Sequence, residues 1–393
     1  MQFGVFSVSD ITRDPVTGIM PTEAERIDAV QLIARTAEAV GLDVFGLGEQ
    51  HHSPFFSSAP TTLLAAIAAQ TKRIALTTAT TVLTTNDPVR VAEDYALLQH
   101  IAKGRLDVIL GRGNTGTVYP WFGRDSDRSL DLAVENYHLL HTLWREENIE
   151  WEGRFRTSLF DFTSVPRPLD DVPPFVWHGS VRSPDIADQA AYYGDGFVVS
   201  NLFAPPASFA PLVELYRQRF EKYGHGTAEQ AIVGLGGQVF VGKTSQEALA
   251  AFRPYFAAAP VYGHDDTLEE FVAKTPLAVG SPQQVIEQIL GFREVYGDYQ
   301  RQMFMIDHSG LPLATVLEQL EWLGGTIVPA LRREFDALRA PGVPSDPPSH
   351  ADLVRRKYGE EPPYQPAPHA THLDRVTGTS PYDDGDGTAL YQE

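Results

Sequence analysis

Short runs of apolar and β-branched residues alternate along the chain with longer segments in which apolar residues recur every three or four positions. The short runs predict strands and the longer segments predict amphipathic helices, because the two periods match the two backbone geometries. The predicted strands are residues 2–7, 44–48, 74–81, 106–110, 175–178, 196–199, 232–241 and 302–306. Eight strands, each followed by a helix, predict an α/β fold of the (β/α)8 TIM-barrel type. A doubly wound open sheet is the alternative, but it usually has fewer units.

The helix after the first strand should bury one face, and the apolar spacing assigns to that face Ile27, Val30, Ala34 and Ala37. Two insertions interrupt the regular alternation of strands and helices. Residues 149–163 resemble a β-hairpin, and residues 257–279 form a polar excursion with Gly and Pro, which is a candidate lid over a binding site.

The composition changes at Pro341, where the regular alternation ends. The last 53 residues contain nine prolines and nine acidic residues, with almost no apolar periodicity. Such a segment cannot bury enough apolar surface to offset its ordering entropy unless it packs on other parts of the protein. We therefore expect a barrel domain over residues 1–340 and a Pro-rich, acidic tail over residues 341–393.

The charge and the residue types exclude several classes of function. The chain carries 31 basic and 51 acidic residues, a formal net charge of −20, which would repel nucleic acids and anionic membranes. It contains no cysteine, so disulfides, zinc–thiolate sites, iron–sulfur clusters and thiol nucleophiles are excluded. The first residues lack the basic region of an export signal, and no apolar run reaches the length of a membrane span. We expect a soluble, cytoplasmic protein without a metal site.

Two glycine motifs resemble nucleotide-binding patterns but lack the required context. Residues 237–244 match the phosphate-loop pattern G-x-x-x-x-G-K-T, yet their centre is an apolar strand, and Thr244 with Glu247 fits a helix cap. Residues 111–116 match G-x-G-x-x-G, but no helix begins directly afterwards, as dinucleotide binding requires. The second motif indicates a loop whose backbone approaches a ligand closely, or a plain tight turn.

Polar residues follow several of the predicted strands. In a TIM barrel the active site lies at the carboxyl ends of the strands, so these residues are read as one set. The set comprises Glu49, Gln50, His51 and His52; Ala79 and Thr80; Arg112 and Asn114; His178, Gly179, Ser180, Arg182 and Ser183; Ser200 and Asn201; and Asp307 and His308. Each residue could instead have a structural role, but six polar strand ends together favour a site.

Two of these strand ends suit a phosphate group. Arg112 lies between two glycines, and an arginine can offer two parallel charged donors to an anion. Ser183 precedes Pro184 and is the expected N-cap of a helix, whose free N–H groups carry partial positive charge beside Arg182. An ordinary capped helix with a solvated arginine is the alternative interpretation.

The motifs occur in an order that resembles the bacterial luciferase-like, flavin-dependent monooxygenases. The resemblance covers about residues 1–338 and rests on residues 46–52 (GLGEQHH), 79–83 (ATTVL), 87–90 (DPVR), 97–100 (LLQH), 104–105, 111–113, Trp144 and 151–153. It implies a (β/α)8 barrel that binds FMN, a homodimer, and a separate reductase that supplies reduced flavin. Ala79–Thr80 should lie against the flavin ring through a non-proline cis peptide. Gly179 and Ser180 are further candidate cofactor-binding residues. Arg112, Asn114, Arg182 and Ser183 should hold the phosphate.

The resemblance implies catalytic residues after the second strand, where the family commonly has Glu-His-His with the first histidine as base. Here Gln50 follows Glu49, and the histidines come one position later. Either His51 acts from this shifted position or the base lies elsewhere, so the candidates are Glu49, His51 and His52. The implied reaction is the transfer of one oxygen atom from O2 to a small organic substrate.

Three other functions compete with the monooxygenase. A deazaflavin-dependent hydride transfer occurs on the same barrel, and its cofactor would make similar contacts. A non-catalytic flavin-binding protein would account for the displaced histidines. A metal-dependent hydrolase would need His51, His52 and His178, but adjacent histidines on a strand point to opposite faces, which disfavours it.

Overall fold

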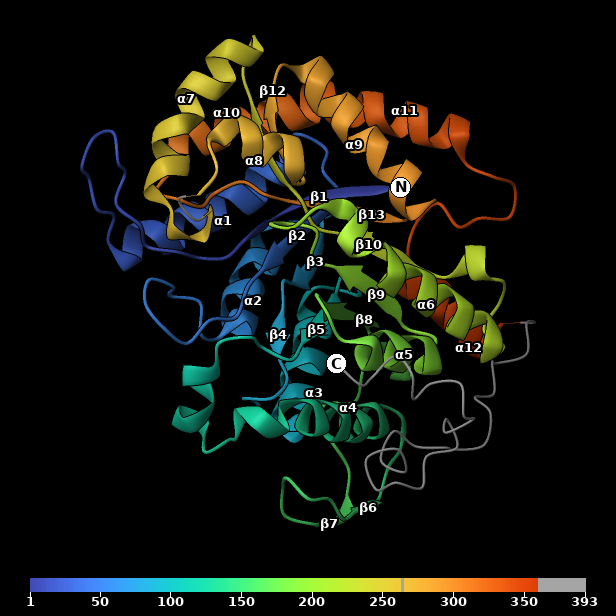
Figure 1. The fold of residues 1–393 in the computed structure, drawn as a ribbon. Coiled ribbons are helices and arrows are strands. Elements are labelled where there is room, and N and C mark those ends of the chain that lie inside the picture. The colour runs from blue at the N-terminus through green and yellow to red at the C-terminus, as the bar shows by residue number, and fades with distance from the viewer. Residues whose placement is uncertain (263–264, 360–393) are drawn as a thin grey trace. The chain divides into compact units, whose positions relative to one another are not determined.

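The computed structural model describes residues 1–262 and 265–359 (Figure 1). They form two compact units. Unit 1 consists of residues 1–81, 105–110 and 175–348, and unit 2 consists of residues 82–104, 111–174 and 349–359. Most of the predicted tail, residues 360–393, lies outside the described residues, as do residues 263–264 of the predicted excursion.

Unit 1 contains a barrel of eight parallel strands, as predicted. They are β1 (Gln2–Ser7), β2 (Val44–Leu47), β3 (Ala75–Thr78), β5 (Asp107–Gly111), β8 (Phe175–Ser180), β9 (Gly196–Val199), β10 (Val233–Leu235) and β13 (Arg301–Met305). The order is β3-β2-β1-β13-β10-β9-β8-β5. A parallel bridge between Leu76 and Leu106 joins β3 to the start of β5. The Leu76 N–H also donates to the Arg105 carbonyl at 2.7 Å, so the sheet closes on itself.

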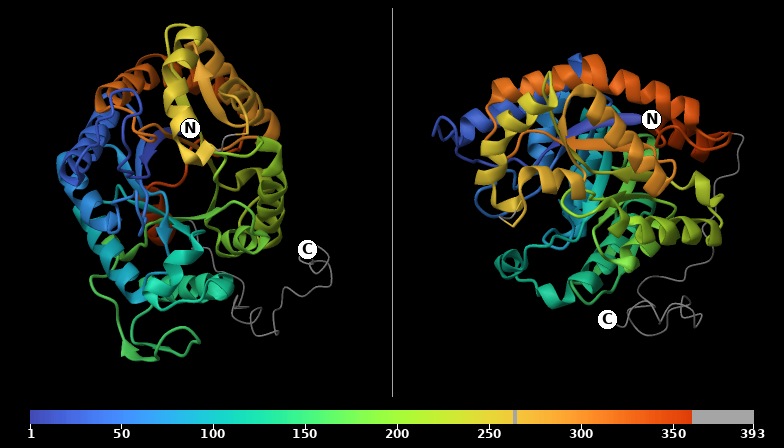
Figure 2. Two further views of the ribbon diagram at one scale, coloured as in Figure 1. Left: turned by 60° about the vertical axis from the view of Figure 1, so that its left-hand side comes forward. Right: turned by 45° about the horizontal axis from the view of Figure 1, so that its top comes forward.

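The helices of unit 1 lie outside this ring of strands, as Figure 2 shows. They are α1 (Glu23–Ala39), α2 (Pro60–Gln70), α5 (Pro184–Tyr193), α6 (Ala210–Lys222), α7 (Ser245–Ala258), α8 (Leu268–Lys274), α9 (Pro282–Tyr296), α10 (Leu313–Trp322) and α11 (Val328–Leu338). The prediction for the face of α1 is wrong at one position. Val30, Ala34 and Ala37 are buried, but Ile27 is 39% exposed and Arg26 is buried in its place. A buried guanidinium is tolerated there because it is paired with carboxylates.

The predicted strand over residues 232–241 is two strands. β10 ends at Leu235, and β11 (Gln238–Val241) follows two glycines later. β11 pairs over its full length with β12 (Leu277–Gly280), a buried strand inside the segment that the sequence suggested as a lid. The lid prediction is therefore wrong over β12. The G-x-x-x-x-G-K-T match is the β11 strand followed by the N-cap Thr244, whose hydroxyl accepts from the Glu247 N–H.

A buried ion pair lies at the amino-terminal end of the barrel. Arg301, at the start of β13, donates to both carboxylate oxygens of Asp107 on β5, at 2.9 and 2.5 Å, and to the side-chain oxygen of Gln2. Its guanidinium also lies 4.7 Å from the centre of the Trp177 ring. Trp177 is accommodated because Gly196 and Gly234 leave space, where a Cβ would come within 2.4 and 3.3 Å of the indole. This end of the barrel is a packed core.

Unit 2 contains two long helices and the predicted hairpin. Its elements are β4 (Thr81–Val82, of which Val82 belongs here), α3 (Pro88–Ile101), α4 (Ser129–Arg145), β6 (Ile149–Trp151), β7 (Leu159–Phe162) and α12 (His350–Tyr358), with short 3-10 helices at η1 (Gly116–Phe122), η2 (Ser126–Arg128) and η3 (Leu169–Asp171). β6 and β7 pair antiparallel, which confirms the hairpin. In the parts of the chain that the structure describes, no helix is both long and apolar enough to span a bilayer.

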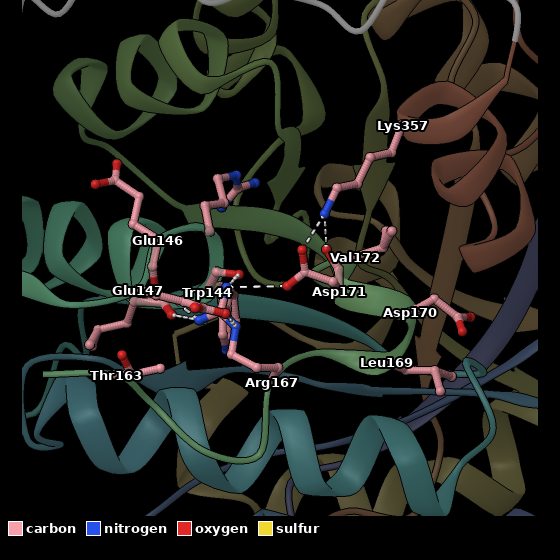
Figure 3. Close-up of polar contacts among 12 residues, drawn as sticks. Trp144, Glu146, Glu147, Thr163, Arg167, Leu169, Asp170, Asp171, Val172 and Lys357 are labelled. Atoms are coloured by element: carbon pink, nitrogen blue, oxygen red, sulfur yellow. Dashed lines mark hydrogen bonds and ion pairs between the residues drawn. The ribbon is translucent and has the colours of Figure 1, made fainter.

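Arg167 organises the polar contacts of unit 2 that Figure 3 shows. Its guanidinium donates to the last carbonyls of α4, at Leu143, Trp144 and Glu146, within 2.8–3.0 Å, and to the Asp171 carboxylate at 3.3 Å. Lys357 of α12 approaches the same carboxylate at 2.6 Å, and this hydrogen bond lowers the pKa of Asp171. The segment that begins at Pro341 thus includes a helix that contacts the rest of unit 2.

Candidate active site

The loop after β2 carries a buried carboxylate in contact with one histidine. Glu49 is 4% exposed, and its Oε1 lies 2.8 Å from His51 Nε2. The Glu49 N–H donates to the Thr80 carbonyl at 3.2 Å, which fixes the backbone that carries the carboxylate. A carboxylate on one ring nitrogen orients an imidazole and selects its tautomer. The structure thus joins Glu49, His51 and Thr80.

His52 is turned toward its own loop. Its Nδ1 lies 2.9 Å from the Ser53 carbonyl, and its ring packs edge-on against Phe55 at 5.2 Å. Of the two adjacent histidines, His51 is therefore the one placed against the Glu49 carboxylate.

The peptide bond between Ala79 and Thr80 is cis, as the resemblance implied. Backbone surrounds it closely on two sides. A Cβ at Gly179 of β8 would lie 3.2 Å from the Thr80 methyl group, and a Cβ at Gly48 would lie 3.3 Å from the Ala79 carbonyl. The carboxyl ends of β2, β3 and β8 therefore meet around this peptide, with little room for larger side chains at the two glycines.

His178 does not lie at the strand end that the sequence suggested. β8 continues to Ser180, so His178 is inside the strand, and its Nε2 lies 3.0 Å from the buried Asp195 carboxylate. The predicted strand ended two residues too early because Gly179 and Ser180 are residue types typical of a turn. In the structure the backbone of both residues pairs with β9. Within residues 1–262 and 265–359, no group of three or more His, Asp or Glu side chains could hold a metal ion.

The end of β8 leads into helix α5. The residue at the N-cap of α5 does not cap the helix through its side chain. Ser183 occupies the N-cap position and Pro184 begins the helix, as predicted, but the Ser183 side chain makes no capping hydrogen bond. Instead the Ser183 N–H donates to Ser180 Oγ at 3.0 Å. The exposed Arg182 forms no ion pair with any residue that the structure describes. Helix N–H groups and a cation without a counter-ion both favour an anion.

Arg112 and Asn114 belong to a loop of unit 2. The Arg112 carbonyl accepts hydrogen bonds from Thr84 Oγ1 and Tyr119 Oη, both at 2.6 Å, so the backbone of the loop is fixed. The Arg112 guanidinium has no hydrogen-bond or ion-pair partner among the described residues. Asn114 is exposed, and the G-x-G-x-x-G pattern leads into the 3-10 helix η1 rather than an α-helix, which argues against dinucleotide binding.

A network of buried charged residues lies at the ends of β1 and β13. The sequence did not predict that these residues contact one another. Arg26 of α1 donates to Asp307 Oδ2 at 3.0 Å and to the Asp10 carbonyl at 2.9 Å. Ser7 Oγ donates to the same Asp307 oxygen at 2.6 Å. Burial, and then the neighbouring Asp307, raise the pKa of Asp10. The available signal was a basic residue beside an otherwise apolar helix face.

Comparison with known proteins gives a consistent assignment. A sequence model of the luciferase-like monooxygenase family matches residues 1–299. The oxygenase component of the flavin-dependent trigonelline monooxygenase of Acinetobacter baylyi is 24% identical, over 79% of this chain and 91% of that protein. The limonene 1,2-monooxygenase of Rhodococcus erythropolis is 25% identical, over 74% of this chain and 78% of that protein. An uncharacterized protein of Sinorhizobium fredii, y4wF, is 24% identical over 57% of this chain, which spans 64% of its length.

Three solved structures share the fold. The monooxygenase RslO1 of Streptomyces bottropensis has a TM-score of 0.74 at 24% identity, over 84% of this chain and 99% of that chain. The oxygenating constituent of 3,6-diketocamphane monooxygenase of Pseudomonas putida, in complex with FMN, has a TM-score of 0.72 at 19% identity, over 84% and 98%. An F420-dependent secondary alcohol dehydrogenase has a TM-score of 0.65 at 18% identity, over 84% and 99%.

The family match covers most of the chain, and the barrel of unit 1 is the fold of these structures. The resemblance predicted from the order of the motifs is confirmed. The chain belongs to the luciferase-like monooxygenase family, and it is an oxidoreductase of the monooxygenase class.

Proposed function

We propose that the protein is the oxygenase component of a two-component system that uses reduced FMN and O2 to oxygenate a small organic substrate. The observation that carries this proposal is the Glu49–His51 pair, held by the Thr80 carbonyl beside the Ala79–Thr80 peptide at the carboxyl end of the barrel. In TIM-barrel enzymes the chemistry takes place at this end. A separate flavin reductase, a homodimeric assembly and a cytoplasmic location are parts of the same proposal.

The residues present fit FMN. The Ser183 side chain makes no capping hydrogen bond at the amino end of α5, and Arg182 beside it has a guanidinium without an ion-pair partner among the described residues. We assign the phosphate to Arg182, Ser183 and Ser180 of unit 1. The resemblance also implies Arg112 and Asn114 as phosphate ligands, and these two residues belong to unit 2. Gly179, Ala79 and Thr80 would flank the flavin ring. Gly179 has no side chain that would occupy the space beside Thr80. When bound, reduced FMN supplies the electrons that activate oxygen.

The chain's own task is then to manage protons and exclude water. The Glu49 carboxylate accepts from His51 Nε2–H, so a proton that the ring takes up or releases is held at Nδ1. Because Glu49 is buried, its attraction for the imidazole is only weakly screened by solvent. General acid–base catalysis of this kind contributes about 10²–10⁴-fold to a rate. Gln50, which displaces the histidines relative to the family pattern, does not separate His51 from Glu49.

A second candidate is hydride transfer with a deazaflavin cofactor. The likeness to the F420-dependent alcohol dehydrogenase favours it, because the same barrel there serves that cofactor. The name of the Acinetobacter relative, an oxygenase component of a flavin-dependent monooxygenase, supports the FMN system instead.

The experiment supplies the purified protein with reduced FMN, and separately with reduced deazaflavin, in the presence of O2 and a panel of alcohols, ketones, aldehydes and aromatic compounds. Oxygenated product and hydrogen peroxide are quantified. We expect oxygenated product with reduced FMN and none with reduced deazaflavin. His51→Ala should bind FMN as the parent does and should form product about 100-fold more slowly, with peroxide in its place.

His52→Ala is the matched control, because His52 faces Ser53 and not Glu49. It should retain most of the parent activity. Product with deazaflavin only would establish the hydride-transfer alternative. Tight FMN binding without turnover on the whole panel would indicate a flavin-binding protein that is not an enzyme.

A further inference from the structure

A chain of hydrogen bonds at the carboxyl end of the barrel ends on a buried histidine. Gln238, at the start of β11, donates from Nε2 to the Leu202 carbonyl at 2.9 Å. Its Oε1 lies 2.7 Å from the hydroxyl of Tyr262, in the 3-10 helix η6 (Pro260–Tyr262). The same hydroxyl contacts Nε2 of His308, three residues beyond the end of β13. All of these side chains belong to unit 1.

The chain fixes the tautomer of His308. The Leu202 carbonyl can only accept, so the amide nitrogen of Gln238 faces it and Oε1 faces Tyr262. The Tyr262 hydroxyl has one hydrogen and donates it to that Oε1. His308 must therefore donate from Nε2–H to the tyrosine oxygen, which leaves Nδ1 as a bare acceptor. Burial keeps the ring neutral by lowering the pKa of His308 to about 4.

The acceptor Nδ1 has no hydrogen-bond partner among the residues that the structure describes, although the side chain is buried. The ring itself lies against Phe252, at 6.2 Å between centroids, and against Tyr262, at 5.8 Å. Neither ring supplies a donor to Nδ1. Buried polar atoms are paired in the large majority of cases. An atom without a protein partner therefore indicates a position where a water molecule or a ligand forms the missing hydrogen bond.

Further buried polar atoms that have no partner within residues 1–262 and 265–359 lie on the same loops. They are Oγ of Ser9, which follows β1, and Oδ1 of Asp307 and Oγ of Ser309, on either side of His308. The Ser309 N–H donates to Asp10 at 3.2 Å, and the Phe56 N–H of the histidine loop donates to the Ser9 carbonyl at 3.0 Å. The His308 loop is thus linked through the β1 loop to the loop that carries His51.

We propose that His308 determines substrate specificity by accepting, at Nδ1, a hydrogen bond from a hydroxyl group of the substrate. The substrate class is then an alcohol with an apolar body, because a hydroxyl donates to the bare nitrogen while the surrounding rings contact carbon. A ketone of the same skeleton presents only lone pairs and would leave Nδ1 unpaired. The inference rests on the proposed function, whose substrate it specifies.

The test compares the binding of 1-indanol and 1-indanone to the full-length protein by isothermal titration calorimetry, with and without oxidised FMN. The two ligands share size and ring system and differ in the donor. We expect the parent to bind 1-indanol about tenfold more tightly than 1-indanone, because only the alcohol donates a hydrogen bond to the buried Nδ1 acceptor.

Two nearly isosteric variants isolate the acceptor. Both His308→Leu and His308→Asn remove the ring and the contact with Tyr262, but the asparagine oxygen can take the place of Nδ1. His308→Asn should keep most of the preference for the alcohol, and His308→Leu should bind both ligands with similar affinity. Thermal unfolding of each variant verifies that it is folded.

The proposal is overturned if the parent binds alcohol and ketone equally or binds neither, which would indicate that buried water satisfies Nδ1. It is also overturned if His308→Leu keeps the preference, or if His308→Asn loses it to the same extent. Failure of the flavin proposal would be recognised separately, because FMN affinity is measured in the same titrations without indanol or indanone.

Discussion

The two ends of strand β13 differ in how their polar side chains are partnered. At its start, Arg301 is 1% exposed, and its guanidinium binds both oxygens of Asp107 and the side chain of Gln2. Beyond its end, Asp307 and His308 are also buried, yet each has one polar atom without a partner among the described residues. The same strand therefore passes from a fully paired ion cluster to a set of unpaired groups.

The difference separates stability from function within one barrel. Removing one partner of a buried ion pair strongly destabilises the folded protein, because the remaining charge stays buried without a counter-ion. Buried polar groups without a partner among the described residues oppose folding, and they remain available to a ligand. In TIM barrels the amino-terminal end serves stability and the carboxyl-terminal end serves catalysis, and the polar atoms of β13 follow this division.

The largest effect on stability is expected at the amino-terminal end. Asp107→Ala should lower the free energy of unfolding by about 3–5 kcal/mol, because it leaves the Arg301 charge buried without its counter-ion. Urea denaturation followed by circular dichroism measures this. The control is Arg253→Ala, whose ion pair with Glu269 is about half exposed and should contribute little to stability because solvent screens it. Equal losses in the two variants would remove the distinction between the two kinds of ion pair.

The next effect concerns ligand binding at the other end. Arg182→Ala should weaken FMN binding by about 1.5–3 kcal/mol, which is roughly ten- to a hundredfold, because it removes a charged hydrogen bond to the phosphate. The resemblance predicts the same effect for Arg112→Ala. Neither guanidinium has an ion-pair partner among the described residues, so the stability of the protein should hardly change. Quenching of flavin fluorescence measures affinity, and Arg253→Ala should match the parent. An unchanged dissociation constant in both variants would show that the phosphate binds elsewhere.

The pH dependence of stability should report the buried His308. Its pKa is lowered to about 4, whereas the unfolded chain has the ordinary value near 6.5. Between these values the unfolded chain binds a proton that the folded protein does not, so the stability from this group is complete above about pH 6.5 and declines toward pH 4. From pH 7 to 5 the parent should lose about 2 kcal/mol more than His308→Asn. Parallel pH profiles for the two proteins would contradict the assignment.

The smallest effect is expected from Ser309→Ala. Its hydroxyl oxygen is buried and has no partner among the described residues, so its removal relieves a desolvation penalty and should raise the free energy of unfolding by at most about 1 kcal/mol. Urea denaturation compared with Asp107→Ala gives the contrast between the two barrel ends. A loss above about 1 kcal/mol would mean that an ordered water molecule pairs this hydroxyl in solution.

Local sequence patterns predicted most of the barrel. The eight strands, the helix starts at Ser183 and Thr244, and the hairpin of unit 2 follow from periods of two and of 3.6 residues and from capping residues, which act over a few positions. β12 was missed because it is four residues long and lies in a polar segment. Ile27 was placed on the wrong face because periodicity favours an apolar residue over an arginine whose counter-ion is distant in sequence.

Partners that are distant in sequence were not predicted. Arg26 binds Asp307 across 281 positions, and Arg301 binds Asp107 across 194. The prediction that His178 lies at a strand end failed for the same reason, since the extension of β8 depends on pairing with β9. A sequence pattern shows that a charged or polar residue is present, but its partner depends on which strands become neighbours.

The sequence by itself determined the alternation of strands and helices, the absence of thiol chemistry and the gathering of polar residues after the strands, because these depend on composition and on short-range periodicity. The tertiary structure decided that His51 and not His52 contacts Glu49. It also decided that His308 Nδ1 has no partner in the part of the chain that the structure describes, while Arg301 is fully paired. Hydrogen bonds form over about 3 Å, and only closure of the barrel brings residues from opposite ends of the chain within that distance.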